Sequence, residues 1–288
     1  MHNEPIYQTY NLIDSGHGRK LEQFGPYRIS RPCAQAVWNP RLPAAEWKQA
    51  HATFTREGDS KWATVGQLPD FWTMTVADIT FKISTTDFGH LGIFPEQRHF
   101  WEWIQQTVKT AKTKRSTLNV LNLFAYSGGS TLAAARGGAQ VCHLDASKGM
   151  VSWARENATL SGLQEAPIRW IIDDVNKFLA REIKRGVRYD AIILDPPSFG
   201  RGAKGEVFKI EDHLPLILKD CQALLSDHPL FILFTCHSPG FSPIVMHHLL
   251  SQMMAAHPGT IDTGEMVLEG KGALSLPSGV YARWQRGS

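Results

Sequence analysis

With 288 residues, 43% of them hydrophobic and 20% charged, the chain can bury a full α/β core with a smaller unit beside it. The formal net charge of +3 permits a nucleic-acid partner without requiring one. The four cysteines show no CxxC spacing, so neither a zinc site nor a disulfide framework is indicated. The amino terminus lacks a signal-peptide pattern, and no run approaches the ~18 to 20 apolar residues of a membrane span. We therefore expect a cytoplasmic protein with no membrane partner and no metal.

Residues 1–90 carry short segments in which apolar and polar residues alternate, separated by turn clusters. Such alternation is typical of half-buried strands and predicts a small antiparallel β-rich domain over residues 1–90. The segments are Tyr10–Asp14, Tyr27–Ser30, Trp72–Val76 and Ile79–Ile83. Four tryptophans of this region either fill the core of the small sheet, which we favour, or stack on bases. They are Trp38, Trp47, Trp62 and Trp72.

A glycine-containing link, Phe88–Arg98, includes a proline that begins a helix running through Trp101 and Val108. We place the border of the second domain at this link and expect that domain over residues 91–288. Gln97 lies in the first turn of the helix. It either faces the site predicted below or belongs to a solvated helix face.

The stretch Leu118–Ala139 combines a buried strand, a turn and a run of good helix formers. The turn is Ala125-Tyr-Ser-Gly-Gly-Ser130. Its paired glycines let the backbone approach a ligand closely, and amides at a helix start carry partial positive charge. The turn is therefore either a cofactor cradle or an ordinary packing turn.

From Leu118 onward, strand and helix patterns alternate. This order predicts a doubly wound, Rossmann-like α/β domain with a mostly parallel sheet and right-handed crossovers. Helices are expected, for example, at 148–161 and 211–225. Strands are expected at 118–124, 140–145, 168–172, 189–194, 229–235, 261–268 and 279–284.

Acidic residues follow three successive strands of this series: Asp145, Asp174 and Asp195. Ligands of such sheets bind beyond the carboxyl ends of the strands. Asp145 is placed to accept the hydroxyls of a ribose, and Asp174 to accept the exocyclic amine of an adenine. Each acid taken alone fits a helix N-cap equally well. All of them behind a glycine turn describe a site for a nucleoside with a charged tail.

The turn Asp195-Pro-Pro-Ser-Phe199 holds a carboxylate and an aromatic ring on a rigid backbone. Its two prolines, Pro196 and Pro197, fix φ and remove two donors, so the turn offers acceptors beside Phe199. This arrangement suits a planar, nitrogen-bearing base lying flat. The alternative is a simple stop signal after a buried strand.

A glycine-rich basic segment, Gly200–Gly205, follows that turn. It is either a lip over the acceptor site, with Arg201 and Lys204 near phosphates, or an ordinary surface loop.

The runs FAYSGG (124–129), LDAS (144–147), DDVNKFL (173–179) and DPPSF (195–199) resemble those of a class I S-adenosylmethionine-dependent methyltransferase. They are similar in particular to the large-subunit ribosomal RNA methyltransferases of the cytosine-5 type and their guanine-modifying relatives. The resemblance covers about residues 88–284 and includes the link Gly92-Ile-Phe94-Pro-Glu-Gln97-Arg98, where Glu96 replaces the family's aspartate. The first ninety residues do not resemble the RNA-binding module that many of those enzymes carry.

This resemblance implies a seven-stranded sheet with an antiparallel last strand, S-adenosyl-L-methionine as cofactor and ribosomal RNA as partner. It gives the methionine end of the cofactor to Phe124, Ala125, Tyr126, Ser127 and Gly128. It gives the rest of the cofactor site to Asp145, Ala146, Asp174, Val175, Asp195 and Gln97. It gives the methyl acceptor to Asp195, Pro196, Pro197 and Phe199.

Cys236 lies at the end of the strand predicted at 229–235, where cytosine-5 members of the family carry Ser-Cys-Ser or Thr-Cys-Ser. In this chain the third residue is His237. Carbon 5 of cytosine accepts a methyl group only after a thiolate has added to carbon 6. Cys236 is therefore either that nucleophile or part of the core, where free cysteines are common. In the second case a ring or exocyclic nitrogen would be methylated without a covalent step.

The sequence thus predicts an enzyme that methylates a base of ribosomal RNA, with cytosine carbon 5 favoured and with Cys236, Asp195 and Phe199 as catalytic residues. The alternatives are a nitrogen of RNA, a protein or a small molecule as acceptor, or a non-catalytic RNA-binding or assembly protein. A nicotinamide oxidoreductase is disfavoured, because the GxGxxG spacing is missing from the turn.

Overall fold

The computed structural model describes residues 10–56, 61–201 and 207–287, and only the backbone of Arg201. The chain divides into two compact units, Met1–Arg98 with Val267–Ser278, and His99–Met266 with Gly279–Ser288. The sequence placed a single border at residue 90. The first unit extends through the link and also takes in a segment from near the carboxyl terminus, because Leu268 and Leu276 pack in one buried cluster with Leu12.

The first unit consists of a five-stranded sheet in the order β1-β2-β3-β4-β5 and a separate hairpin, β6–β7. The strands pair antiparallel, as the alternating pattern predicted, except that β3 and β4 are parallel. Ala77 and Asp78 join β6 to β7 with positive φ angles of 52° and 60°, the geometry of a tight hairpin turn. The elements are β1 Tyr10–Gly16, β2 Arg19–Phe24, β3 Tyr27–Pro32, α1 Ala44–Trp47, β4 Ala52–Thr55, β5 Lys61–Thr64, β6 Trp72–Val76, β7 Ile79–Ile83 and the short 3-10 helix η1 Pro95–Gln97.

The four tryptophans of this unit serve its own structure. Trp72 is buried and the other three are partly buried. Each indole N–H donates to an acceptor within the unit: Trp38 to the Ser15 carbonyl (3.0 Å), Trp47 to Asp14 Oδ2 (3.1 Å), Trp62 to the Thr86 carbonyl (2.8 Å) and Trp72 to the Phe24 carbonyl (3.0 Å). The prediction that they fill the core is confirmed for Trp72 only, in the β6–β7 hairpin, whereas the other three are partly buried and held by these hydrogen bonds.

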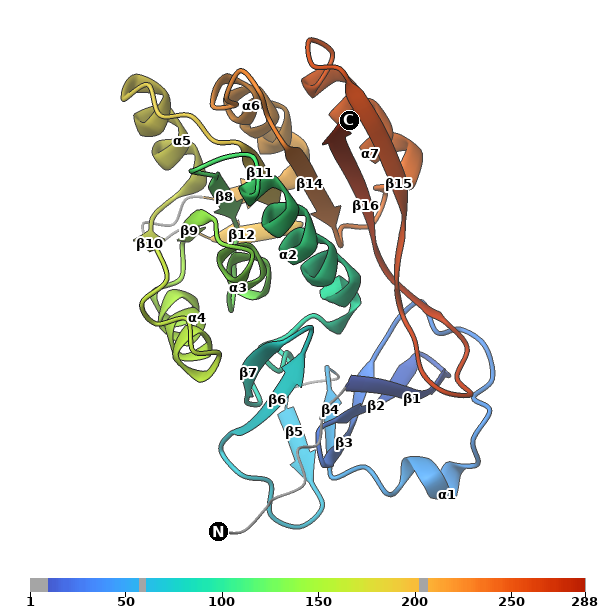
Figure 1. Cartoon of the computed structure of the whole chain (residues 1–288). Coiled ribbons are helices and arrows are strands. Elements are labelled where there is room, and N and C mark those ends of the chain that lie inside the picture. Colours follow the sequence, from blue (N-terminus) through green and yellow to red (C-terminus); the bar gives the residue numbers. More distant parts are fainter. Residues whose placement is uncertain (1–9, 57–60, 202–206, 288) are drawn as a thin grey trace. The chain divides into compact units, whose positions relative to one another are not determined.

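The second unit is built on a seven-stranded sheet in the order β10-β9-β8-β11-β14-β16-β15, whose strands are labelled in Figure 1. β8 to β11 and β14 are parallel neighbours, and β16 runs antiparallel to β14. The predicted doubly wound sheet with an antiparallel last strand is confirmed. Its strands are β8 Asn119–Leu123, β9 Gln140–Asp145, β10 Ile168–Ile172, β11 Ala191–Leu194, β14 Phe231–Cys236, β15 Gly259–Leu268 and β16 Leu276–Arg286, the last two reaching across the border between the units.

Helices cover both faces of this sheet. One face packs with α5, α6 and α7 into a buried apolar cluster, and the other carries α2, α3 and α4. Local signals set several helix starts: the Ser147 hydroxyl caps α4, and Ser242 caps α7 with a proline directly after it. The helices are α2 Arg98–Lys112, α3 Gly129–Arg136, α4 Lys148–Leu160, α5 Val175–Lys184, α6 Ile210–Ala223 and α7 Pro243–Met253, and a small hairpin pairs β12 Phe199–Arg201 with β13 Val207–Lys209.

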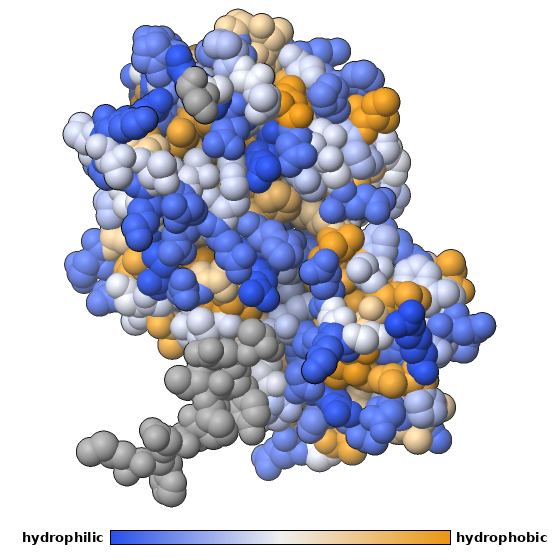
Figure 2. Space-filling view, turned by 45° about the vertical axis from the view of Figure 1, so that its right-hand side comes forward, coloured by the Kyte–Doolittle hydropathy of each residue, from blue (hydrophilic) through white to orange (hydrophobic). Residues whose placement is uncertain are grey.

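The surface is mixed in character. On the face drawn in Figure 2, hydrophobic side chains form small separate groups between polar ones. Among the described helices, none combines the length and the apolar character that crossing a bilayer requires.

Candidate functional site

The carboxyl ends of the parallel strands meet at one edge of the sheet, and the register aligns them. Leu123 pairs with Leu144 on one side and with Leu194 on the other. The next residues along these strands, Phe124, Asp145 and Asp195, therefore lie in one row. This row brings together the glycine turn, the predicted ribose acid and the predicted acceptor turn.

The turn after β8 has an unusual backbone. Phe124, Tyr126 and Gly128 have φ angles of 55°, 49° and 92°, and left-handed geometry at a non-glycine residue costs ~1–3 kcal/mol. Neighbours hold the turn in this shape: the Ala125 amide donates to the Leu144 carbonyl (3.0 Å), and the buried Asn157 donates its side-chain amide to the Ser127 carbonyl (2.9 Å). A strained turn that its surroundings hold in place is typical of a ligand-binding site.

The two positions of the turn require glycine for different reasons. A Cβ at Gly128 would lie 3.1 Å from the Cβ of Ala154, and the positive φ also favours glycine there. A Cβ at Gly129 would lie 2.6 Å from the ring of Trp101 in α2. Gly129 is therefore required by helix packing, which the sequence pattern did not reveal.

Asp145 closes the turn from the neighbouring strand. Its Oδ2 accepts from the Tyr126 amide (2.9 Å) and its Oδ1 from the Ser147 amide (2.8 Å). Burial raises the pKa of Asp145, and these two amides act in the opposite direction. Each carboxylate oxygen has a second lone pair, so hydroxyl donors can still be accepted.

Ile172 pairs with Asp145 at the end of β10 and leaves 51% of its surface exposed. An exposed apolar side chain beside an acid suits a flat ring whose edge is polar. The sequence analysis missed Ile172, although a β-branched residue directly before the acidic pair 173–174 was a signal for it. Ala146, on the other side of Asp145, is exposed.

Asp174 is the N-cap of α5, where its Oδ1 accepts from the Lys177 amide at 3.0 Å. Asp174 thus makes the hydrogen bond of a helix N-cap, the alternative role that the sequence analysis gave for each of the three acids. Val175 is buried in the core beneath it. Asp173, just before Asp174, forms an ion pair with Arg181.

At the acceptor turn, Asp195 is half-buried, Pro196 is buried, and Pro197 is exposed. Phe199 leaves 51% of its surface exposed at the start of β12. Arg201 ends the same strand, and Lys204 lies outside the described residues. β12 takes in Gly200 and Arg201 of the segment Gly200–Gly205, and the rest of that segment lies outside the described residues.

Two contacts join this turn to the end of β14. His237 Nδ1 lies 3.1 Å from Asp195 Oδ1, and the Ser238 hydroxyl donates to the Ser198 hydroxyl at 2.7 Å. The sequence marked His237 only as a departure from the family pattern. Its pairing with Asp195 depends on β11 and β14 being neighbours in the sheet.

Cys236 is buried, with 1% of its surface exposed. Its Sγ accepts from the Ser238 amide at 3.4 Å. Burial raises the pKa of this thiol, although the Ser238 contact lowers it in part. A nucleophilic cysteine needs access and a lowered pKa, so these features are those of a core cysteine.

Gln97 lies in η1 and is buried, which rules out a solvated helix face. It belongs to the first unit, whereas the glycine turn belongs to the second. Among the described residues, no group of three or more His, Cys, Asp or Glu side chains is arranged to hold a metal ion.

The sequence profile of S-adenosylmethionine-dependent methyltransferases matches residues 42–246. The chain belongs to this family. The methyltransferase is 42% identical to a solved S-adenosylmethionine-dependent methyltransferase from Agrobacterium tumefaciens, with a TM-score of 0.92 over 99% of this chain and 95% of the other. A solved methyltransferase from Streptococcus mutans shares the fold at 17% identity, with a TM-score of 0.74 over 98% of this chain and 76% of that one.

Curated relatives carry a more specific name. The ribosomal RNA large subunit methyltransferase K/L of Marinobacter nauticus is 32% identical over 185 residues, which are 62% of this chain and 24% of the relative. The ribosomal RNA large subunit methyltransferase K of Neisseria meningitidis is 29% identical over 203 residues, 69% of this chain and 54% of the relative. The chain thus spans about a quarter and about half the length of these two relatives.

Membership in the family confirms the predicted enzyme class and the cofactor, S-adenosylmethionine. The oxidoreductase and the non-catalytic alternatives are thereby set aside. The edge of the sheet suits this cofactor, because Asp145 offers oxygens to hydroxyls and Ile172 presents an apolar surface.

Proposed function

We propose that this methyltransferase transfers a methyl group to a base of large-subunit ribosomal RNA. Support comes from the names of the curated relatives and from the acceptor turn, where Asp195 stands in the same row as Asp145 and Phe199 is exposed beside it. The observation that carries the proposal is this pairing of a carboxylate with an exposed aromatic ring on a proline-fixed turn. A base that lies flat on a ring can donate an N–H to the adjacent carboxylate.

The cofactor site of the proposal follows the row of strand ends. The turn residues Phe124, Ala125, Tyr126, Ser127 and Gly128 hold the methionine end. Asp145 and Ala146 take the ribose, with Asp174, Val175 and the surface of Ile172 around the adenine. Asp195 completes the set. When bound, the cofactor supplies a methyl group on a positively charged sulfur.

The substrate site of the proposal consists of Asp195, Pro196, Pro197 and Phe199. Asp195 orients the base by accepting one of its N–H groups, and the prolines keep the carboxylate in place. Arg201 and Lys204 are proposed contacts to RNA phosphates.

We infer that the methylated atom is a nitrogen rather than cytosine carbon 5. The carbon-5 reaction needs a thiolate that reaches the base, and Cys236 is buried with a raised pKa. A base nitrogen has its own lone pair and needs no covalent step. Cytosine carbon 5, the acceptor that the sequence favoured, is therefore replaced in this proposal by a nitrogen of the base.

The test uses large-subunit RNA from cells that lack this protein, labelled S-adenosylmethionine and mass spectrometry of the digested nucleosides. We expect an N-methylated nucleoside, with turnover retained in Cys236→Ala. Cys221→Ala, which removes another buried thiol in α6, is the matched control. Loss of turnover in Cys236→Ala alone, with cofactor binding intact, would restore the carbon-5 reaction. Absence of label in RNA would reject RNA as the substrate.

A further inference from the structure

The imidazole of His237 is the side chain at the acceptor turn that the proposed roles leave unused. Its Nδ1 lies 3.1 Å from Asp195 Oδ1, and the two side chains keep 31% and 25% of their surface exposed. Both follow strands whose carboxyl ends form the cofactor edge. The pair is therefore ordered by a contact and still open to a ligand.

Two features fix the position of the ring. Ser238, the next residue, is buried and donates to Ser198 in the acceptor turn. On the antiparallel strand β16, Gly279 faces the ring, since a Cβ there would lie 3.1 Å from His237 Cδ2. A side chain at 279 would also press on Met266 Cε (2.5 Å) and on the Cys236 carbonyl oxygen (2.9 Å), so the ring lies in a closely packed place.

The contact with Asp195 also bears on the tautomer of the ring. Asp195 at the end of β11 and the thiol of Cys236 at the end of β14 are titratable groups beside the imidazole, and β16 presents Gly279 to it. A carboxylate at Nδ1 favours the tautomer that carries the proton on Nδ1. Nε2 is then an acceptor, as in a histidine that an aspartate orients for proton transfer.

We propose that His237, oriented by Asp195, is the general base that takes the proton from the methyl-accepting nitrogen. This inference rests on the proposed function. The nitrogen lone pair forms the bond to the methyl carbon, and the carbon–sulfur bond breaks with its electron pair left on sulfur. The proton of the nitrogen passes to Nε2 of His237, and the imidazolium is stabilised by the Asp195 carboxylate.

The chemistry of the methyl-accepting nitrogen explains why a general base speeds the reaction. A base nitrogen that shares its lone pair with the ring is weakly nucleophilic and becomes strongly acidic as the new bond forms. A neutral imidazole within reach removes that proton during the transfer, which typically gives about 10²- to 10⁴-fold in rate.

The decisive variant is His237→Asn in the full chain. Its side-chain amide can still donate to Asp195, but it has no nitrogen that accepts a proton. We expect the single-turnover rate on large-subunit RNA to fall about 10²- to 10⁴-fold. The affinities for S-adenosylmethionine and RNA should stay unchanged. The parent should lose rate as pH falls and His237 becomes protonated, and the variant should lose that acidic limb.

A second variant, His237→Ala, separates catalysis from structure, because added imidazole should restore part of its rate. His228→Asn is the matched control, an exposed histidine near the amino end of β14. If wild-type protein transfers no methyl group to RNA, the proposed function fails. If wild-type protein is active and His237→Asn keeps its rate and pH profile, only the present inference fails. A slow His237→Ala without imidazole rescue and with the parental pH profile would also overturn it.

Discussion

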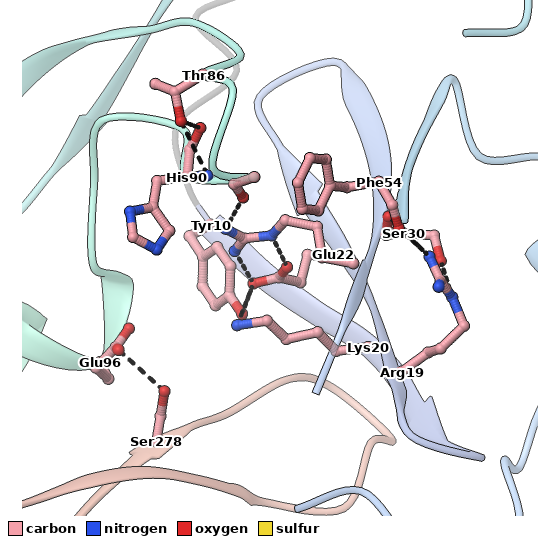
Figure 3. A network of polar contacts seen from close by, with 12 residues as sticks. Tyr10, Arg19, Lys20, Glu22, Ser30, Phe54, Thr86, His90, Glu96 and Ser278 are labelled. Atoms are coloured by element: carbon pink, nitrogen blue, oxygen red, sulfur yellow. Dashed lines mark hydrogen bonds and ion pairs between the residues drawn. The ribbon is translucent and has the colours of Figure 1, made fainter. Parts of the chain in front are cut away.

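Two carboxylates, Glu22 in the first unit and Asp195 in the second, each contact a nitrogen-bearing side chain but differ in burial. Glu22 of the first unit is fully buried, and its oxygens accept from Arg31 Nε and Nη2 (both 2.8 Å) and from the Tyr10 hydroxyl (2.9 Å), with Lys20 Nζ at 3.3 Å (Figure 3). Asp195 of the second unit is partly exposed and pairs with His237. Glu22 is enclosed by donors of its own unit, whereas the Asp195 side chain keeps a quarter of its surface exposed.

The difference shows that burial and saturation, rather than residue type, separate a structural carboxylate from a functional one. Burial would raise the pKa of Glu22, but Arg31 and Lys20 outweigh it and hold this pKa below its usual value. Arg31 also donates to the Gly89 carbonyl (3.1 Å), so the network ties the sheet to the link. Four predictions test this contrast, in decreasing order of expected effect.

Arg31→Ala should destabilise the protein by about 3–5 kcal/mol, because it leaves Glu22 buried without its main partner. Denaturant-induced unfolding measures this loss. Arg28→Ala on the same strand is the matched control, since Arg28 pairs with Glu46 at the surface (3.3 Å). We expect the control to cost less than ~1 kcal/mol. Equal losses of stability in both variants would show that the buried ion pair contributes no more than the surface pair.

Asp145→Ala should weaken S-adenosylmethionine binding by about 10- to 100-fold, since a hydrogen bond to a charged group contributes ~1.5–3 kcal/mol. Titration calorimetry measures the affinity. Asp262→Ala removes an exposed acid of β15 that pairs with Arg283 and should leave the affinity unchanged. Unchanged binding in Asp145→Ala would remove Asp145 from the cofactor site.

Gly129→Ala should destabilise the protein by ~1–3 kcal/mol, because the new Cβ would press on the Trp101 ring. Gly149→Ala is the control. It adds the same group to the first turn of α4, where the nearest atom is the Ser147 hydroxyl at 3.8 Å. Thermal unfolding compares the two. A stability loss confined to Gly149→Ala would contradict the packing role of Gly129.

The last effect, the pH dependence of stability, is the smallest near neutral pH, because it grows only as the pH falls. Burial, with the charges of Arg31, Arg56 and Lys20, lowers the pKa of His90 to about 4. The unfolded chain, with a histidine pKa near ~6.5, then binds more protons than the folded one. Stability should therefore fall as pH drops from about 6.5 towards 4, and His90→Gln should lessen the slope of the melting temperature against pH. An unchanged slope would show that His90 does not cause the pH dependence of stability.

Much of the second unit could be predicted from local pattern. The strands Gln140–Asp145 and Ile168–Ile172 have the predicted bounds, because each is a short run rich in apolar residues that is followed by an acidic residue and a helix start. The glycine turn and the three acids were located for the same reason. The first unit was harder, since β2 and β5 lack clear alternation and β4 is only four residues long.

Several features of the site could not be predicted, because they depend on partners distant in sequence. Position 129 requires glycine because Trp101 of another helix packs against it. Cys236 is buried by residues distant in sequence, and Ile172 is exposed at the end of the edge strand β10.

The amino-acid sequence by itself determined the order of strands and helices, the position of the glycine turn and the acids at the strand ends. Periodicity and turn chemistry act over a few residues, so they can be read without a fold. The tertiary structure alone decided which carboxylate is saturated, which thiol is buried and which histidine meets Asp195. These properties depend on neighbours that only the packed sheet brings together.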